Sequence, residues 1–226
     1  ITNLATGGAE TMLLKLLQQL DRSRFTLTGV SLVGLDEVGP RIQALGIPFH
    51  ALGMSRDGVP NPLTVLRLAK LLRQLQPDVV HTWMYHADFL GGLAARLAGC
   101  RRVIWGIHHS NLSKEVNKRS TLWVVKACAL LSHRVPAQIV SCSQRAKEVH
   151  AAVGYAADKL HVIPNGFDLD RFVPDAVARA SVRAEPGLAP DTPLVGLVAR
   201  FDSQKNHFGF VEAATQVHAQ RPDVHF

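Results

Sequence analysis

The sequence predicts an α/β protein in which a parallel sheet carries helices on both faces, followed by an incomplete second α/β domain. Short runs rich in Val, Ile and Leu alternate with amphipathic helical patterns along the chain, as in parallel sheets with crossover helices. Polar residues follow several of these runs, where ligand sites form in open α/β sheets. We place the N-terminal domain at residues 1–163, a junction and linker at 164–193, and the second domain at 194–226.

The composition limits the classes of protein that fit. The chain has 226 residues, is 47% hydrophobic and carries a formal net charge of +7, which suits a phosphorylated ligand, nucleic acid or an anionic membrane. Sparse aromatic residues and the lack of an arginine-rich run disfavour nucleic acid. The cysteines Cys100, Cys128 and Cys142 form no Cys-x-x-Cys pair, so we expect a reduced, cytosolic protein without a zinc knuckle.

Each element of the first domain has its own signal. A Leu-rich helix is expected after Gly8. Further helices are expected at 38–45, which is short, at 61–75, and at 113–134, which is long. Ser143 is the expected cap of one more helix. Asn61 is the expected N-cap of the third, with Pro62 at its first position. Strands are expected at Ile1–Leu4, Phe25–Val33, Ile47–Leu52, Val79–Thr82, Arg102–Ile107, Gln138–Cys142 and Leu160–Ile163. Because both termini look like interrupted strands, we expect a fragment of a longer protein.

Polar residues follow two of these strands. His86 and Asp88 come shortly after the fourth strand and are candidate ligand contacts, although a carboxylate there could instead stabilise the helix terminus. For Trp83 and Tyr85, packing under the loop is as good an explanation as ligand contact. The pair His108-His109 at the end of the fifth strand indicates function more than a lone histidine would.

Cations and glycines mark two helix N-termini. Gly7-Gly8 lets the backbone approach a ligand, although a tight turn is a common alternative. Leu194 to Ala199 predicts a strand buried on both faces, with Arg200 at its end and Lys205 in the loop before the next helix. Such a position suits anionic ligands, but spacing alone favours an ion pair for Arg200 and a solvated Lys205.

The helix predicted at 113–134 mixes Lys and Arg with Val, Leu and Trp. A solvated basic face over an apolar core stripe is the preferred interpretation, and peripheral contact with an anionic membrane is the second.

The chain resembles the group-1 type retaining glycosyltransferases with the GT-B fold. The resemblance rests on Gly-Gly-Ala-Glu from Gly7, the strand-end His108, the Val162–Asp168 junction and the Arg200-x-x-x-x-Lys205 loop, in the family's order. It implies a Rossmann-like N-terminal domain. It also implies that Arg200 and Lys205 hold the diphosphate of a sugar nucleotide, near which Gly7 and Gly8 lie.

The same resemblance implies that His108 contacts the transferred sugar near its anomeric centre and acts in catalysis, with His109 as the one-residue alternative. His86 and Asp88 are then further substrate contacts. The pair Asp168 and Asp170 has the spacing of a metal-binding motif of another glycosyltransferase fold, but it follows a turn, so we assign it no metal. We expect no cofactor and no required metal.

The implied function is transfer of a sugar, with retention, from a nucleoside-diphosphate donor to a saccharide or lipid-linked acceptor in cell-surface polysaccharide or lipopolysaccharide synthesis. We expect a cytoplasmic location, with peripheral contact at the inner face of the membrane as the second interpretation. The family's two-glutamate signature would lie beyond Phe226, so we expect this chain alone to be inactive.

Two other functions stay open at this stage. A sugar-nucleotide epimerase would share the architecture, and a non-catalytic α/β binding domain would share the fold. The sequence lacks the Gly-x-Gly-x-x-Gly, Walker A and Gly-x-Ser-x-Gly motifs, which disfavours a dinucleotide dehydrogenase, a P-loop enzyme and a serine hydrolase.

Overall fold

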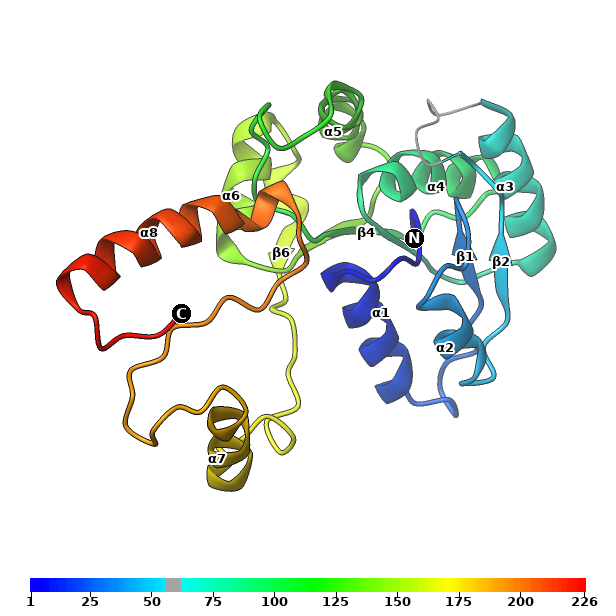
Figure 1. Ribbon diagram of the computed structural model, residues 1–226. Helices are drawn as coiled ribbons and strands as arrows, with labels where there is room; N and C mark the ends of the chain where they lie inside the picture. The colour runs from blue at the N-terminus through cyan, green and yellow to red at the C-terminus, as the bar shows by residue number, and fades with distance from the viewer. Residues whose placement is uncertain (56–61) are drawn as a thin grey trace. The chain divides into compact units, whose positions relative to one another are not determined.

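The computed structural model describes residues 1–55 and 62–226 (Figure 1). The expected N-cap Asn61 lies outside these residues. The described chain forms two compact units, Ile1–Gly166 and Phe167–Phe226.

Strands and helices alternate in the first unit, and all of its strand pairs are parallel. This confirms the predicted α/β class. The elements are α1 (Gly8–Gln19), β1 (Gly29–Ser31), α2 (Gly39–Gln43), β2 (Phe49–Ala51), α3 (Pro62–Leu75), β3 (Val80–Trp83), α4 (Tyr85–Leu97), β4 (Val103–Ile107), α5 (Arg119–Ser132), β5 (Gln138–Ser141), α6 (Gln144–Val153), the 3₁₀ turn η1 (Ala157–Lys159) and β6 (Leu160–Val162).

The strands form two groups, β1–β2 and β3–β4–β5–β6. A groove of about 860 Å³ borders both groups and is lined mainly by apolar side chains of α1, α3, β1 and β3. The expected strand at Ile1–Leu4 is not regular, but the Leu32 and Val33 amides donate to the carbonyls of Ile1 and Thr2 at 3.1 Å. The N-terminal segment therefore extends the β1–β2 group.

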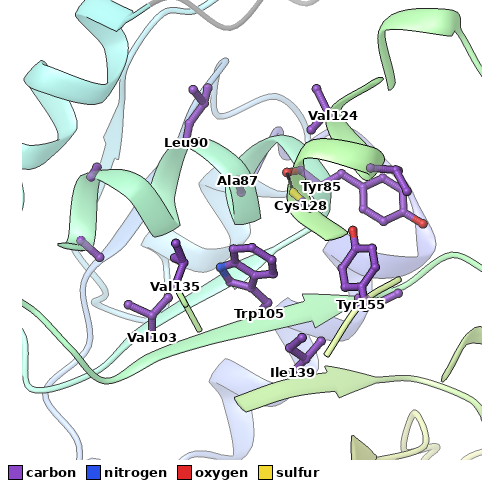
Figure 2. Packing of buried hydrophobic residues seen from close by; sticks show 14 of the residues in the cluster. Tyr85, Ala87, Leu90, Val103, Trp105, Val124, Cys128, Val135, Ile139 and Tyr155 are labelled. Carbon is purple, nitrogen blue, oxygen red and sulfur yellow. Dashed lines mark hydrogen bonds between the residues drawn. The ribbon is translucent and has the colours of Figure 1, made fainter. Parts of the chain in front are cut away.

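Two apolar cores cover opposite faces of the strands, which confirms helices on both sides (Figure 1). Side chains of α3, α4, α5 and α6 pack on one face around Trp105, which is fully buried. Figure 2 shows this indole lying between β4 and α4, close to Val135 and Tyr155. On the other face, α1 and α2 pack with Leu4 and Trp83.

The helix predicted at 113–134 is shorter than expected, because α5 begins at Arg119. Side-chain hydrogen bonds hold the preceding residues in a turn. Asn117 Nδ2 donates to the carbonyls of Asn111 and Ser113, and Asn111 Oδ1 accepts from the Ser113 amide. Asn side chains that bond nearby backbone in this way compete with helix formation. By contrast, Ser143 caps α6 as predicted, since its Oγ accepts from the Ala146 amide at 3.1 Å.

The second unit contains α7 (Ala176–Ala184), the 3₁₀ turn η2 (Ser203–Lys205) and α8 (His207–Gln220). The buried strand predicted at Leu194–Ala199 is wrong for this structure. Leu194 makes an isolated parallel bridge with His225, and Val198 is fully exposed. A run of Val and Leu forms a buried strand only where neighbouring strands supply hydrogen bonds and other elements cover its faces. Among the described residues, the run Leu194–Ala199 pairs only with the short backbone segment around His225.

Candidate functional site

His108 lies just past the carboxyl end of β4, beside the end of β3. The parallel register pairs Trp83 with Gly106, so side chains of Trp83 and His108 emerge on the same face. Their rings stack with centroids 4.3 Å apart and an interplanar angle of 11°. Trp83 is almost fully buried in the α1–α2 core, so its indole is a fixed surface against which the imidazole packs. Of the two interpretations of Trp83, packing is the one this geometry supports.

Gly106 leaves room for two histidines. A Cβ at this position would lie 2.9 Å from the Thr82 carbonyl and 3.4 Å from Nε2 of both His81 and His108. Contacts of 2.9 Å with backbone cannot be relieved by a rotamer change, so the site requires glycine here. His81 also lies 5.3 Å from Trp83, measured between ring centroids. His81, Trp83 and His108 therefore form one ring cluster around Gly106, which we call the histidine cluster.

Desolvation keeps both histidines of the cluster neutral near pH 7, although the His81 side chain is more exposed than that of His108. Desolvation lowers the pKa of His108 to about 4. It also lowers the pKa of His81 to about 4, with the neighbouring His108 adding to the effect. A neutral imidazole has one donor nitrogen and one acceptor nitrogen. Among the described residues, His108 Nδ1 is buried without a hydrogen-bond partner. At neutral pH His108 therefore presents no positive charge, and a hydrogen bond to a polar ligand would use Nε2, since Nδ1 is inaccessible.

A strained turn joins β3 to α4 next to the cluster. Met84 has φ 75° and ψ 153°, a backbone conformation that is close to glycine-only. Two hydrogen bonds hold it, since the Met84 amide donates to the Gly106 carbonyl at 3.1 Å and the Asp88 amide donates to the Met84 carbonyl at 2.9 Å. Such a residue costs about 1–3 kcal/mol and persists only where its surroundings impose it.

Asp88 lies inside the protein rather than at its surface. The carboxyl group is fully buried, and Thr82 Oγ1 donates to its Oδ1 at 2.5 Å. Burial raises the pKa of Asp88 to about 8, against the opposing effect of hydrogen bonds from Thr82 and the Gly106 backbone. The predicted contact of Asp88 with substrate thus has no geometric support. The residue instead ties the first turn of α4 to β3.

His86 and His109 remain candidate contacts. His86 is half-buried at the start of α4, and desolvation lowers its pKa. His109 Nε2 is buried and has no hydrogen-bond partner among the described residues. Tyr85, by contrast, is fully engaged in the core, because its hydroxyl hydrogen-bonds His150 Nε2 at 2.8 Å.

The glycine pair lies at the N-terminus of α1. Gly7 is the N-cap, and Gly8 is the first helical residue. The carboxylate of Glu10 folds back against Gly7, so a Cβ there would require the Glu10 side chain to move, whereas a Cβ on Gly8 would meet nothing within 4 Å. A carboxylate at a helix N-terminus is favourable because it faces the positive end of the helix dipole. Any anionic ligand at this loop must therefore approach an end that already holds one negative group.

Arg200 and Lys205 lie in the second unit, on the loop before α8. Local hydrogen bonds close this loop. His207 Nε2 bonds the Arg200 carbonyl at 2.7 Å, and Asn206 Oδ1 accepts from the Gly209 amide at 3.2 Å. Both cations are exposed, and neither forms an ion pair within residues 1–55 and 62–226. The ion-pair interpretation of Arg200 therefore has no partner among the described residues, and both cations lie on the loop that precedes α8.

The DxD-like pair acts as a local turn. Asp168 Oδ1 accepts from the amides of Asp170 and Arg171 at 3.2 and 3.1 Å. Within the described part of the chain, no group of three or more His, Cys, Asp or Glu side chains is placed to hold a metal ion.

His81 was not predicted as a site residue, and the role of Trp83 was left open between packing and ligand contact. The signal was present in the sequence, because side chains two residues apart on a strand share a face. His81 and Trp83 are so related, and parallel pairing of neighbouring strands brings His108 beside them. The register that aligns these strands, however, is set by tertiary packing.

The Glycosyltransferase Family 4 model matches residues 6–171 of the chain. A protein named EpsF from Bacillus subtilis (strain 168) is 26% identical over 222 residues, covering 96% of this chain and 57% of its own length. An Escherichia coli UDP-Gal:alpha-D-GlcNAc-diphosphoundecaprenol alpha-1,3-galactosyltransferase is 31% identical over 185 residues, covering 80% of this chain and 46% of its own length. The chain thus spans about half the length of these curated relatives.

Solved structures agree on the fold. The crystal structure of Anabaena Alr3699/HepE in complex with UDP superposes with a TM-score of 0.74 at 20% identity, over 93% of this chain and 54% of that one. A UDP-N-acetylglucosamine 2-epimerase from Rickettsia bellii superposes less well, with a TM-score of 0.54 at 14% identity, over 99% of this chain and 60% of that one. At these identities the likeness concerns the GT-B architecture alone.

Proposed function

Because the chain belongs to Glycosyltransferase Family 4, we propose that its natural protein transfers a sugar from a nucleoside-diphosphate donor to an acceptor hydroxyl, with retention at the anomeric carbon. The observation that carries the proposal is the pair of exposed cations, Arg200 and Lys205, at the N-terminus of α8. Cations and free amides at a helix N-terminus favour a diphosphate. The complexes of the Anabaena protein with UDP support a nucleotide donor of this kind.

The cations act on the leaving group. As the bond from the sugar to the diphosphate breaks, negative charge grows on the phosphate oxygens, and Arg200 and Lys205 stabilise it without a required metal. Stabilisation that grows toward the transition state raises the rate more than it raises ground-state binding.

The transferred sugar is the proposed ligand of His108. Its imidazole is neutral near pH 7 and held by the Trp83 stack, so it can form a hydrogen bond of fixed direction to a sugar hydroxyl. His86 and His109 are proposed as further substrate contacts, and Gly7 and Gly8 as backbone near the diphosphate. We no longer include Asp88, because its carboxyl group is inaccessible.

The proposed acceptor is a saccharide or a lipid-linked saccharide in cell-surface polysaccharide or lipopolysaccharide synthesis. The Escherichia coli relative, whose name specifies a diphosphoundecaprenol-linked acceptor, supports the lipid-linked option. A reducing, cytoplasmic location at the inner face of the membrane fits the three free cysteines. Because the chain spans about half the length of its curated relatives, we propose that the 226-residue chain alone does not turn over.

The test measures binding and turnover in the complete natural polypeptide that carries this chain. Arg200→Ala and Lys205→Ala should each weaken nucleoside-diphosphate binding by about ten- to a hundredfold, since a charge-assisted bond to phosphate contributes roughly 1.5–3 kcal/mol. The loss of transfer rate should exceed the loss of binding. Arg171→Ala removes an equally exposed cation from the same unit and serves as the control.

Each competing function has its own outcome. Unchanged nucleotide affinity in both variants would contradict the assigned roles, and no nucleotide binding by the wild type would favour a non-catalytic binding domain. Inversion at C2 of the donor sugar without transfer would favour an epimerase. Loss of activity on chelation would contradict metal independence.

A further inference from the structure

Three helices of the first unit share an unusual charge pattern. Helices α3, α4 and α5 cover the same face of the strands and pack side by side, α3 on α4 and α4 on α5 (Figure 1). Their single carboxylate is Asp88, which is fully buried. Their exposed charged residues are therefore all cations, namely Arg67, Lys70, Arg73, Arg96, Arg119 and Lys126. We call the solvent side of these three helices the α3–α5 outer face.

Large apolar side chains lie among these cations. The exposed fractions are 60% for Trp123 and 80% for Leu130 on α5, and 58% for both Leu63 and Leu66 on α3. Leu97 at the end of α4 is also exposed. Burying such side chains removes apolar surface from water, which stabilises any complex that covers them.

The arrangement on α5 is an alternating stripe. Arg119, Trp123, Lys126 and Leu130 follow one another at steps of four, three and four residues, so they share one side of the helix. Val124 and Cys128 on the other side are buried. Phe89 of α4 contacts Trp123 edge-on, with ring centroids 6.1 Å apart, so the indole packs against α4 on one side.

We infer that the α3–α5 outer face docks on an anionic lipid bilayer. Cations attract the negative surface of the bilayer, and Trp and Leu between them enter the boundary between headgroups and acyl chains. The absence of exposed carboxylates on these three helices removes the repulsion that acidic side chains would add. In the described residues, no helix is long and apolar enough to span a membrane.

The inference deepens the proposed function, because a lipid-linked acceptor would lie in the bilayer that this face contacts. It does not depend on turnover, however. The experiment below measures binding to vesicles alone, so its failure and the failure of the transferase proposal are separate results.

The first measurement compares two charge reversals by cosedimentation with vesicles of phosphatidylcholine and phosphatidylglycerol, and with phosphatidylcholine alone. Arg119→Glu with Lys126→Glu changes the outer face. Arg24→Glu with Arg41→Glu changes exposed cations in the loop after α1 and on α2. Each exchange removes two units of charge, so both double variants fall from +7 to +3. A cation near an anionic surface contributes roughly a fivefold increase in binding, so the outer-face variant should bind at least about 25-fold more weakly.

The second measurement uses Trp123 as a reporter. The other two tryptophans, Trp83 and Trp105, are 7% and 0% exposed, so a change in emission on vesicle binding reports on Trp123. Anionic vesicles should shift the emission to shorter wavelength, and lipids brominated on the acyl chains should quench it. Trp123→Leu should abolish both signals while keeping the apolar contact and most of the affinity.

Four results would overturn the inference. Wild type could fail to bind anionic vesicles, or the two charge reversals could weaken binding equally, which would make net charge the cause. Binding could occur without a change in Trp123 emission, which would place the contact elsewhere. Finally, heparin could bind as tightly as vesicles and lose affinity in the same variant without any emission change, which would indicate a polyanionic partner in place of a bilayer.

Discussion

His108 in the first unit is stacked on a buried indole, whereas Arg200 and Lys205 in the second unit lie exposed on a loop closed by local hydrogen bonds. The surroundings of His108 determine its protonation state and its orientation. The surroundings of the two cations determine the path of the backbone and leave the side chains in water. The side-chain orientation of His108 is thus fixed before a ligand binds, whereas the side chains of Arg200 and Lys205 must be ordered by the ligand.

The difference has a consequence for mutagenesis. A change around His108 alters packing as well as chemistry, so stability and activity should change together. A change at Arg200 or Lys205 removes an exposed side chain and should alter ligand binding with little effect on stability, because surface substitutions usually cost less than about 0.5 kcal/mol.

The largest effect is expected for His108→Ala in the complete natural polypeptide. Removing one preorganised hydrogen-bonding group from a reacting site typically lowers kcat by about 10²–10³-fold. Steady-state turnover of donor, with circular dichroism to verify folding, measures this effect. His109→Ala is the control, and it should be milder. If His109→Ala is the damaging change and His108→Ala is silent, the catalytic assignment belongs to the neighbouring residue.

Gly106→Ala should combine loss of stability with loss of activity. The added Cβ would press on the Thr82 carbonyl at 2.9 Å and on the two imidazoles, and overpacking of this kind costs about 1–3 kcal/mol. Denaturant unfolding monitored by tryptophan fluorescence measures the cost. Gly8→Ala is the matched control, because a Cβ there meets nothing within 4 Å. Equal stability of the two variants would mean that the histidine cluster is looser than this geometry requires.

Asp88 should make the first unit less stable as the pH rises. Its folded pKa of about 8 exceeds the ordinary value of 3.8, so between these values the folded state retains a proton that the unfolded state has released. The contribution is complete below pH 4 and is lost as the pH rises through 8. His81 and His108, whose folded pKa values near 4 lie below the ordinary 6.5, act only at lower pH.

Asp88→Asn isolates this contribution because the amide oxygen can still accept from Thr82. The free energy of unfolding should be measured for both proteins between pH 6.5 and 8.5. The difference between them should grow with pH, in favour of the variant. The Ile1 amino group, whose pKa is lowered to about 6, acts in the opposite sense and interacts with the Asp88 charge, so it should be blocked by acetylation in both proteins before they are compared. A constant difference would mean that Asp88 is ionised in the folded protein.

Much of the fold followed from the sequence because its signals are local. Pro62 at the start of α3 and the Ser143 cap of α6 act within one helical turn, so α3 was predicted close to its observed bounds and α6 at its observed start. The strand at Leu194–Ala199 was wrong because burial of a strand depends on distant partners. The helix at 113–134 was too long because two asparagine side chains, Asn111 and Asn117, bond nearby backbone instead.

The candidate site was less predictable for the same reason. The sequence indicated His108 from its place after a strand, but the stack with Trp83 depends on the register between β3 and β4. Asp88 was predicted to contact substrate or to stabilise the helix terminus, whereas its carboxyl group lies in the core and accepts a hydrogen bond from Thr82. Arg200 and Lys205 stay predictions, since exposed cations look alike until a ligand is present.

The smallest expected effect concerns the strained turn and compares the two units once more. Met84→Gly should raise stability, because glycine adopts the observed φ of 75° without steric cost. Relief of about 1–3 kcal/mol of strain is offset by roughly 0.5–1 kcal/mol of added chain entropy in the unfolded state. We therefore expect a net gain of about 1 kcal/mol, measured as an increase in the denaturant midpoint. Turnover should fall at the same time, because a looser turn holds Trp83 less firmly against His108.

Asn206→Gly in the second unit is the control. Asn206 also has a positive φ, of 50°, but its side chain caps α8 by accepting from the Gly209 amide. Glycine there relieves little strain and removes the cap, so the free energy of unfolding should change by only about 0.3 kcal/mol. A positive φ at Asn206 is thus matched by its side chain, whereas at Met84 it is imposed by the surrounding structure. If Met84→Gly lowers stability, packing of the Met84 side chain contributes more to stability than the strained backbone costs. The turn beside the histidine cluster would then not be a net source of instability.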